Sequence, residues 1–221
     1  MKLLIHALLK VILGIVLVGA LIFLSAGTLC FWQGWLLIGV LFLPMVAVGV
    51  VLFFRSPERL EKRLSAKEKQ KDQAWVVILS GVMFILGFVL AGLNVRLGGY
   101  SLPKGVSIAA ATVFLLAYLI YLEVIRENEF LSRVIEVQEG QRVIDTGLYA
   151  VVRHPMYAAT LLLFLSMPLI LGSVWSLLAF LPYPFLIARR IKGEERLLEK
   201  ELDGYVEYKE KVRYRLIPYV W

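Results

Sequence analysis

The sequence predicts an all-α integral membrane protein, a multi-pass bundle of about five to six transmembrane helices. Hydrophobic residues make up 60% of its 221 residues, whereas soluble domains carry about 45–50% even when glycine is counted. Charged residues still make up 19%, so they must be clustered between long apolar runs. These runs, rather than any repeat, define the elements of the chain.

The first half of the chain holds four such runs, each with at most one charged residue. Each has about the 17–25 residues that a helix needs to cross the hydrocarbon core. The predicted spans are Leu8–Ala26, Phe31–Phe54, Ala74–Leu93 and Gly105–Leu122. We therefore expect a four-span membrane region over residues 1–122, followed by a region over residues 123–221 that holds the polar motifs.

A fifth apolar run, Met156–Ala188, is too long for one straight span. Leu171-Gly172-Ser173 interrupts it, which predicts a hairpin of two short helices over residues 154–188. Each arm would have about 16 residues, or roughly 24 Å against a hydrocarbon core of about 30 Å. We expect the hairpin to cross the bilayer only in part, and to be bent by Pro168, Pro182 and Pro184.

Lysine and arginine residues lie almost entirely on one side of these spans. Of the 24, 22 fall in the N-terminal segment and in Arg55–Lys71, Arg126–Arg153 and Arg189–Arg215. The positive-inside rule therefore predicts that both termini and a C-terminal helix are cytoplasmic. The membrane would be the plasma or inner membrane of a prokaryote, or the endoplasmic reticulum of a eukaryote. Anionic lipid heads account for the net charge of +7 without nucleic acid.

Several classes of protein are excluded by what the sequence lacks. Cys30 is the single cysteine and His6 and His154 are the only histidines, so neither a disulfide framework nor a Cys/His metal site is expected. The chain has no GxGxxG, Walker, GxSxG or HExxH motif. A non-catalytic transporter or assembly factor remains an alternative, although the middle of the spans holds no acidic or basic residue of the kind that ion pathways need.

Two polar stretches beside the membrane could carry chemistry, and the first covers residues 138–157. Its glycines mark turns, and Pro155 suits the first turn of a helix, where its missing N–H would be unpaired anyway. Arg153 and His154 would then lie at the N-terminal end of the hairpin. They are either site residues or side chains that reach lipid phosphates.

The second stretch covers residues 189–198, after the hairpin. One helical stripe, the pattern of a buried face, is formed by Ile187, Ile191, Leu198 and Leu202. Arg190 and Glu194 lie on or beside it, where a carboxylate next to the bilayer is costly unless it is paired or used. A structural ion pair between the two is the alternative. Glu195 lies about 100° further round the helix and is expected to face water.

Together these residues resemble the isoprenylcysteine carboxyl methyltransferase family, which belongs with the integral-membrane phospholipid methyltransferases. The resemblance covers about the last 90 residues in order. It rests on Gly147-Leu148-Tyr149, on Arg153-His154-Pro155-Met156-Tyr157, on the hairpin, on Arg190-Ile191 with Glu194-Glu195, and on Leu198, Tyr205, Tyr208, Val212 and Pro218.

The resemblance implies a methyltransferase that uses S-adenosylmethionine and has no Rossmann domain, with residues 123–221 as its catalytic, cofactor-binding region. The implied cofactor residues are Gln138, Gln141, Arg142, Val143, Ile144, Tyr149, His154, Pro155, Met156, Tyr157 and Glu194. Arg190 would bind the acceptor. The implied catalytic residues are Arg190, Glu194, His154 and Arg153.

The expected reaction is methyl transfer to the carboxylate of an isoprenylcysteine-like or other lipid-borne acceptor at the cytoplasmic face of the membrane. Arg190 would orient this acceptor in a site that excludes water. An ethanolamine phospholipid is the alternative acceptor, and its amine would need His154 or a tyrosine as base. A membrane lipid reductase that uses NADPH is a further alternative, because its membrane fold has, near its C-terminal end, a hairpin of helices related to the one predicted here over residues 154–188. Membrane lipids and a lipophilic acceptor are the expected partners.

Overall fold

The computed structural model describes residues 2–64, 71–132 and 135–221, and these residues form helices joined by turns and loops. Five helical stretches are long and apolar enough to cross a membrane. The prediction of an all-helical, multi-pass membrane bundle is therefore confirmed.

Four long helices coincide with the four predicted spans, with ends that differ by a few residues. They are α1 (Lys2–Ala26), α2 (Trp32–Arg55), α4 (Lys71–Arg96) and α5 (Lys104–Glu127). Several run past the apolar stretch into charged sequence, because backbone hydrogen bonding does not stop where the side chains become polar. The connection after α2 also contains a short helix that the sequence did not predict, α3 (Pro57–Leu64), whose Leu60 is buried.

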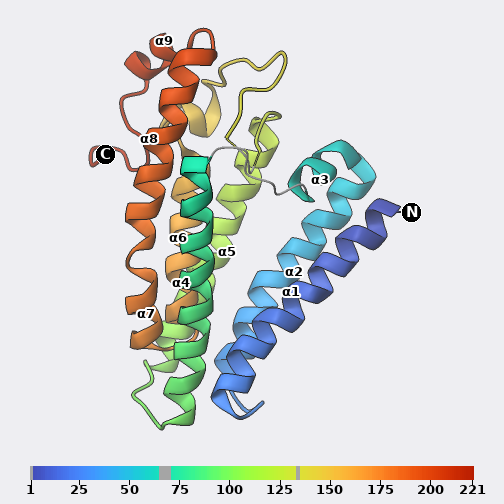
Figure 1. Cartoon of the computed structure of the whole chain (residues 1–221), viewed down its shortest axis with the longest axis vertical. Helices are drawn as coiled ribbons and strands as arrows, with labels where there is room; N and C mark the ends of the chain where they lie inside the picture. The colour runs from blue at the N-terminus through green and yellow to red at the C-terminus, as the bar shows by residue number, and fades with distance from the viewer. Residues whose placement is uncertain (1, 65–70, 133–134) are drawn as a thin grey trace.

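The second half of the chain forms α6 (Pro155–Ile170), α7 (Val174–Phe180), α8 (Tyr183–Glu201) and α9 (Tyr205–Lys211). Both termini, α3, α9 and the loop after α5 lie at one end of the bundle, which we call the polar end (Figure 1). The opposite end, which we call the far end, consists of loops 27–31 and 97–103 and turn 171–173. The helices thus alternate in direction as the charge pattern requires.

The hairpin differs from its prediction in its second arm. Its first arm, α6, has the expected 16 residues and begins at Pro155, and Pro168 lies inside it without ending it. The second arm was expected to be equally short, but α7 and α8 together form a stretch of 28 residues, Val174–Glu201. Pro182 and Pro184 mark the break between them, at positions where a helix begins. The C-terminal helix expected after the hairpin is thus the continuation of its second arm.

Two glycines of α4 allow the bundle to pack closely. A Cβ at Gly92 would overlap Ser25 of α1, and one at Gly87 would overlap the ring of Phe180 at the end of α7. Small residues serve this purpose in membrane bundles, where apolar burial alone does not drive helices together. Phe84 and Phe164 add an edge-to-face contact between α4 and α6, with ring centroids 4.8 Å apart. Close packing against α4 therefore holds α6 and α7, the helices on either side of the turn at residues 171–173.

Neutral polar groups close the far end. Gln33 Nε2 donates a hydrogen bond to Ser101 Oγ at 3.4 Å, and the Leu102 N–H donates to the Gly172 carbonyl at 2.8 Å. Gly172 has a φ of +67°, which favours glycine at this turn. The loop before α5 is thereby tied to the turn between α6 and α7.

Candidate functional site

A cleft opens at the polar end, between the end of α5, the loop that follows it, the start of α6, and α8 and α9. Its empty space, with its open mouth included, is about 840 Å³. The predicted site residues that line it are Gln141, Arg142, Val143, Ile144, Tyr149, Arg153, His154, Met156, Tyr157, Arg190 and Glu194.

Two predicted cofactor residues are not part of the described lining. Gln138 lies in the loop behind it, where its Nε2 donates to the Phe130 carbonyl at 2.5 Å and its N–H donates to Gln141 Oε1 at 2.8 Å. Pro155 occupies the first position of α6. Gln138 therefore braces the loop, and Pro155 begins the helix that carries Tyr157.

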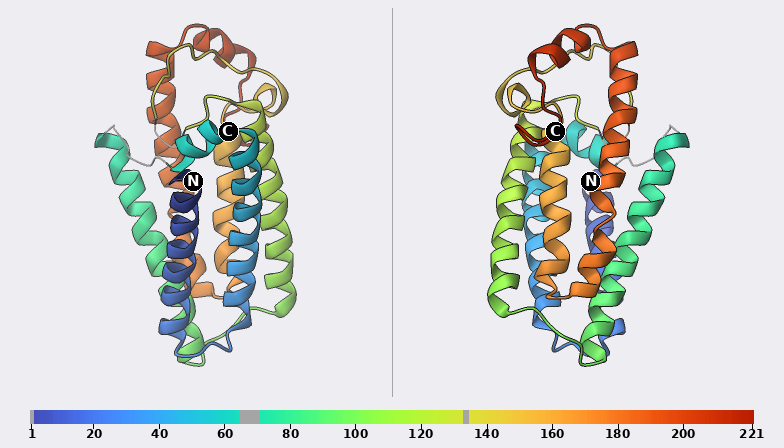
Figure 2. Two further views of the ribbon diagram at one scale, coloured as in Figure 1. Left: turned by 90° about the vertical axis from the view of Figure 1, so that its right-hand side faces the viewer. Right: turned by 90° about the vertical axis from the view of Figure 1, so that its left-hand side faces the viewer.

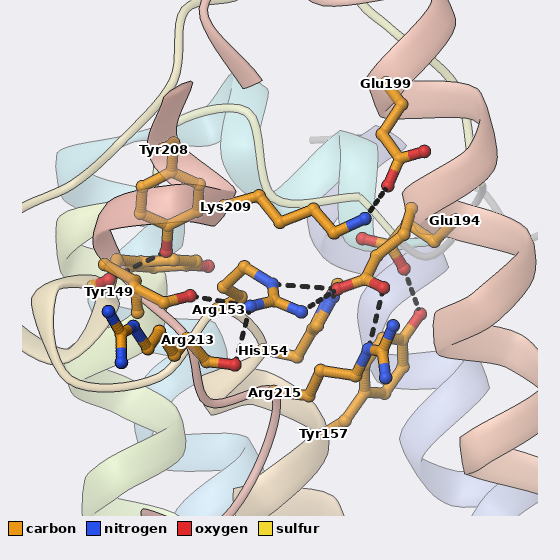
Figure 3. Close-up of polar contacts among 12 residues, drawn as sticks. Tyr149, Arg153, His154, Tyr157, Glu194, Glu199, Tyr208, Lys209, Arg213 and Arg215 are labelled. Carbon is orange, nitrogen blue, oxygen red and sulfur yellow. Dashed lines mark hydrogen bonds and ion pairs between the residues drawn. The ribbon is translucent and has the colours of Figure 1, made fainter. Parts of the chain in front are cut away.

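Arg190 and Glu194 meet at the hydroxyl of Tyr157. This hydroxyl donates to Glu194 Oε2 at 2.5 Å and accepts from Arg190 Nε at 3.1 Å. Figure 3 shows Tyr157 of α6 beneath Glu194 of α8. Arg190 and Tyr157 are both buried. The site therefore holds a cation and an anion one turn apart on α8, with a tyrosine from another helix between them.

Glu195 does not face water, and that prediction was wrong. Its exposure is 3%, and Oε1 accepts from Arg153 Nε at 2.8 Å while Oε2 accepts from Arg215 Nε at 2.8 Å. His154 Nε2 lies 3.3 Å from Oε1 (Figure 3). The sequence did contain the signal, because Glu195 follows Ile191 by four residues and precedes Leu198 by three, the spacing of the buried stripe itself.

Arg153 joins three segments of the chain. Besides Glu195 on α8, its Nη1 donates to the carbonyls of Val212 and Arg213 at 2.6 and 2.9 Å. The backbone N–H groups of Arg153 and His154 donate to the Tyr214 and Arg215 carbonyls, both at 2.9 Å. The segment before α6, the end of α8 and the tail after α9 are thus held as one unit. In this arrangement Arg153 positions the wall of the cleft.

The Gly147-Leu148-Tyr149 motif forms a single turn of 3₁₀ helix, η1 (Gly147–Ala150), fixed by the end of α5. The Glu127 carboxylate accepts from the Leu148 N–H, with Oε2 at 3.0 Å. Gly147 has a φ of +51°, and a Cβ there would overlap this carboxylate. Asn128 Nδ2 donates to the Tyr149 hydroxyl at 2.9 Å. Sequence analysis missed Glu127 and Asn128, since their partners lie about 20 residues away.

Two tyrosines from α9 close the cleft in different ways. The Tyr208 hydroxyl donates to the Tyr149 carbonyl at 2.7 Å. The Tyr205 hydroxyl is buried and has no hydrogen-bond partner within the described part of the chain. Burial raises the pKa of Tyr205, and the nearby carboxylates of Glu195 and Glu194 raise it further. The hydroxyl therefore keeps its proton at neutral pH and is a donor that awaits an acceptor.

The lining offers both charges and apolar surface. Arg190 and Arg142 supply cations, Glu194 supplies a carboxylate, and Ile144 and Leu198 supply apolar contacts. Across the residues that the structure describes, no group of three or more His, Cys, Asp or Glu side chains could hold a metal ion. The cleft is therefore suited to an organic ligand that carries charges of both signs and an apolar part.

Sequence comparison finds known proteins that are similar to part of this chain, and the matched part includes most of the cleft. Residues 105–203 match the family model described as phospholipid methyltransferase. The Delta(14)-sterol reductase of Mus musculus is 33% identical to the chain in an alignment of 89 residues that covers 37% of this chain and 20% of the reductase. The chain therefore aligns with about a fifth of the length of that relative. From α5 to the end of α8, the segment that builds most of the cleft, this protein is similar to the phospholipid methyltransferases of membranes.

Proposed function

We propose that the protein is an S-adenosylmethionine-dependent methyltransferase that acts on a lipid-borne carboxylate, of the isoprenylcysteine type, at the cytoplasmic face of its membrane. The observation that carries the proposal is the contact of Arg190 and Glu194 through the Tyr157 hydroxyl at the wall of the cleft. The family match over residues 105–203 supports methyl transfer as the reaction class.

The cleft residues fit this cofactor by their chemistry. Glu194 would hold a positively charged or hydroxyl-bearing part of the cofactor, and the buried Tyr205 hydroxyl lacks the acceptor that a polar ligand offers. Val143, Ile144 and Leu198 would pack against the faces of its aromatic adenine ring. When bound, S-adenosylmethionine would supply a methyl group that is attached to a positively charged sulfur. A carboxylate oxygen can accept this methyl group directly, because a carboxylate is already deprotonated.

Arg190 supports a carboxylate over an ethanolamine as the acceptor, a choice that the sequence left open. Its buried guanidinium attracts a carboxylate and repels an ammonium group. An ethanolamine acceptor would also need a base, and His154 Nε2 faces Glu195, which already accepts from two arginines. A carboxylate acceptor needs only to be oriented and shielded from water, which Arg190 and the membrane-facing bundle would provide.

A reductase is the second candidate, because the similarity to the mouse sterol reductase covers 89 residues. It would require the cleft to bind NADPH instead. The two functions therefore differ in a ligand that can be measured directly.

Calorimetry on the detergent-purified protein tests the proposal. We expect S-adenosylmethionine and S-adenosylhomocysteine to bind, and Glu194→Gln to weaken this binding about 10- to 100-fold by removing one charge-assisted contact. The matched control is Glu199→Gln, on the same helix, where Glu199 pairs with Lys209 outside the cleft. Binding of NADPH alone would favour the reductase, and equal affinities in the two variants would refute the role of Glu194.

A further inference from the structure

The tail after α9 ends in a tight backbone turn, which we call the C-terminal hairpin (residues 215–221). The N–H groups of Arg215, Leu216 and Ile217 all donate to the Trp221 carbonyl, at 2.9, 3.0 and 3.3 Å, and the Trp221 N–H donates back to the Ile217 carbonyl at 3.1 Å. The guanidinium of Arg215 lies over the Trp221 ring, 5.2 Å from its centroid. These contacts fix the segment as a defined surface.

The C-terminal hairpin returns from the polar end to the side of the membrane bundle. Leu216 is buried in the same hydrophobic core as the membrane-spanning helices, and Trp221 packs against that core. Figures 1 and 2 place the end of the chain beside the bundle, below α9 and near the height at which α4 begins. The hairpin therefore lies where the membrane-spanning helices meet the polar end.

Its outer face is apolar. Ile217, Tyr219 and Val220 are 50%, 90% and 75% exposed. Tyr219 has a φ of +65°, the single positive value among the described non-glycine residues, and its ring packs on Tyr214 with centroids 5.2 Å apart. An unfavourable backbone conformation thus holds a large aromatic residue outward, where it gains no contact with the core.

Tyrosine and tryptophan next to aliphatic residues are typical of the membrane–water interface, where an aromatic ring enters the headgroup layer and its polar atom stays hydrated. Arg213, which is exposed just before the hairpin, is placed to meet lipid phosphates. The continuity of Leu216 and Trp221 with the membrane core favours lipid over a protein partner as the occupant of this face.

We propose that the C-terminal hairpin is a membrane-contact element that inserts Ile217, Tyr219 and Val220 into the headgroup layer at the polar end. Arg215 connects it to the partner of the cleft residue Arg153, since Arg215 Nε donates to Glu195 Oε2 at 2.8 Å and Glu195 Oε1 accepts from Arg153. Contact with the bilayer therefore stabilises the position of the tail that Arg153 holds.

Fluorescence quenching in nanodiscs of phosphatidylcholine and phosphatidylglycerol, in which water reaches both faces, tests this contact. The full chain carries Cys30→Ser and one attachment site for an environment-sensitive label, either Tyr219→Cys or Val220→Cys. Glu207→Cys is the matched control, since Glu207 is exposed on α9, further from the membrane core. We expect brominated lipid to quench the label at positions 219 and 220, and iodide to quench it at position 207.

Either of two outcomes would overturn the proposal. Iodide could quench the label at positions 219 and 220 as strongly as at position 207, which would place the hairpin in water. Brominated lipid could quench all three positions equally, which would show that the hairpin is no closer to the bilayer than α9. Because the two attachment sites are tested separately, a local disturbance at the strained position 219 does not decide the result.

Discussion

The two ends of the bundle bury different kinds of polar group. The far end buries neutral amides and hydroxyls, such as Gln33, Asn94 and Ser107, and the first two of these donate hydrogen bonds to loop residues. Each buried charged side chain of the described residues, namely Arg153, Arg190 and Glu195, lies at the polar end. An unpaired neutral group costs about 1–3 kcal/mol, whereas the desolvation of each buried ion costs several kcal/mol. The difference supports the polar end as the location of the proposed site, because buried charge is costly unless it is paired or used.

The largest effect is expected from Glu195→Ala. This change leaves Arg153, whose side chain is 3% exposed, without its carboxylate partner. Removal of one partner from a buried pair typically destabilises a protein by about 3–5 kcal/mol. Thermal unfolding in detergent measures it, with Glu199→Ala as the control, because exposed pairs contribute about 0–1 kcal/mol. A melting temperature equal to that of the control would contradict the structural role of Glu195.

The next effect is expected from Arg190→Ala, and it should appear in turnover. Misplacement of a reacting group by about 1 Å can cost about 100-fold in rate, and we expect a loss of this size with a lipid-borne carboxylate. Arg190→Lys should not restore the rate, since an ammonium does not reproduce the planar fork of a guanidinium. The control is Arg196→Ala, at an exposed position of the same helix. Equal turnover in the Arg190→Ala and Arg196→Ala variants would show that Arg190 does not orient the acceptor.

A smaller effect separates the two tyrosines of α9. Tyr205→Phe removes a buried hydroxyl that has no partner in the described structure, so stability should be kept while affinity for S-adenosylhomocysteine falls about 3- to 10-fold. Tyr208→Phe removes the bond to the Tyr149 carbonyl and should lower the free energy of unfolding by about 1 kcal/mol. Calorimetry and thermal unfolding on both variants check this crossed pattern. If Tyr205→Phe bound the ligand with unchanged affinity, its hydroxyl would have no role in binding.

The smallest effect is expected at the far end. The Ser107 hydroxyl is buried and has no hydrogen-bond partner among the residues described, so Ser107→Ala should change the free energy of unfolding by less than about 1 kcal/mol and should not alter ligand affinity. Thermal unfolding measures the stability, and the same calorimetric titration measures the ligand affinity. A large loss of affinity would mean that the two ends are coupled, and the contrast between them would not hold.

Sequence analysis predicted the membrane spans correctly because long runs without charged residues are typical of transmembrane helices. The bounds of α1, α2, α4 and α5 follow those runs closely. It identified most of the predicted residues that line the cleft, because Tyr157, Arg190 and Glu194 lie where apolar sequence meets charged sequence. It misjudged Glu195, although the residue continues the buried stripe, because its partners Arg153 and Arg215 lie 42 and 20 residues away in the sequence. It also missed Glu127, since no local pattern shows that its carboxylate holds the turn at Gly147.

The most direct test of the central claim is the transfer of a labelled methyl group. The purified protein would be given methyl-labelled S-adenosylmethionine with either a farnesylated cysteine, which presents a carboxylate, or phosphatidylethanolamine. We predict that the farnesylated acceptor becomes labelled and that base releases this label as methanol, as expected for a methyl ester. We predict that the Arg190→Ala variant does not label it. Base-stable label in phosphatidylethanolamine, or no transfer to either acceptor by a protein that binds NADPH, would contradict the account.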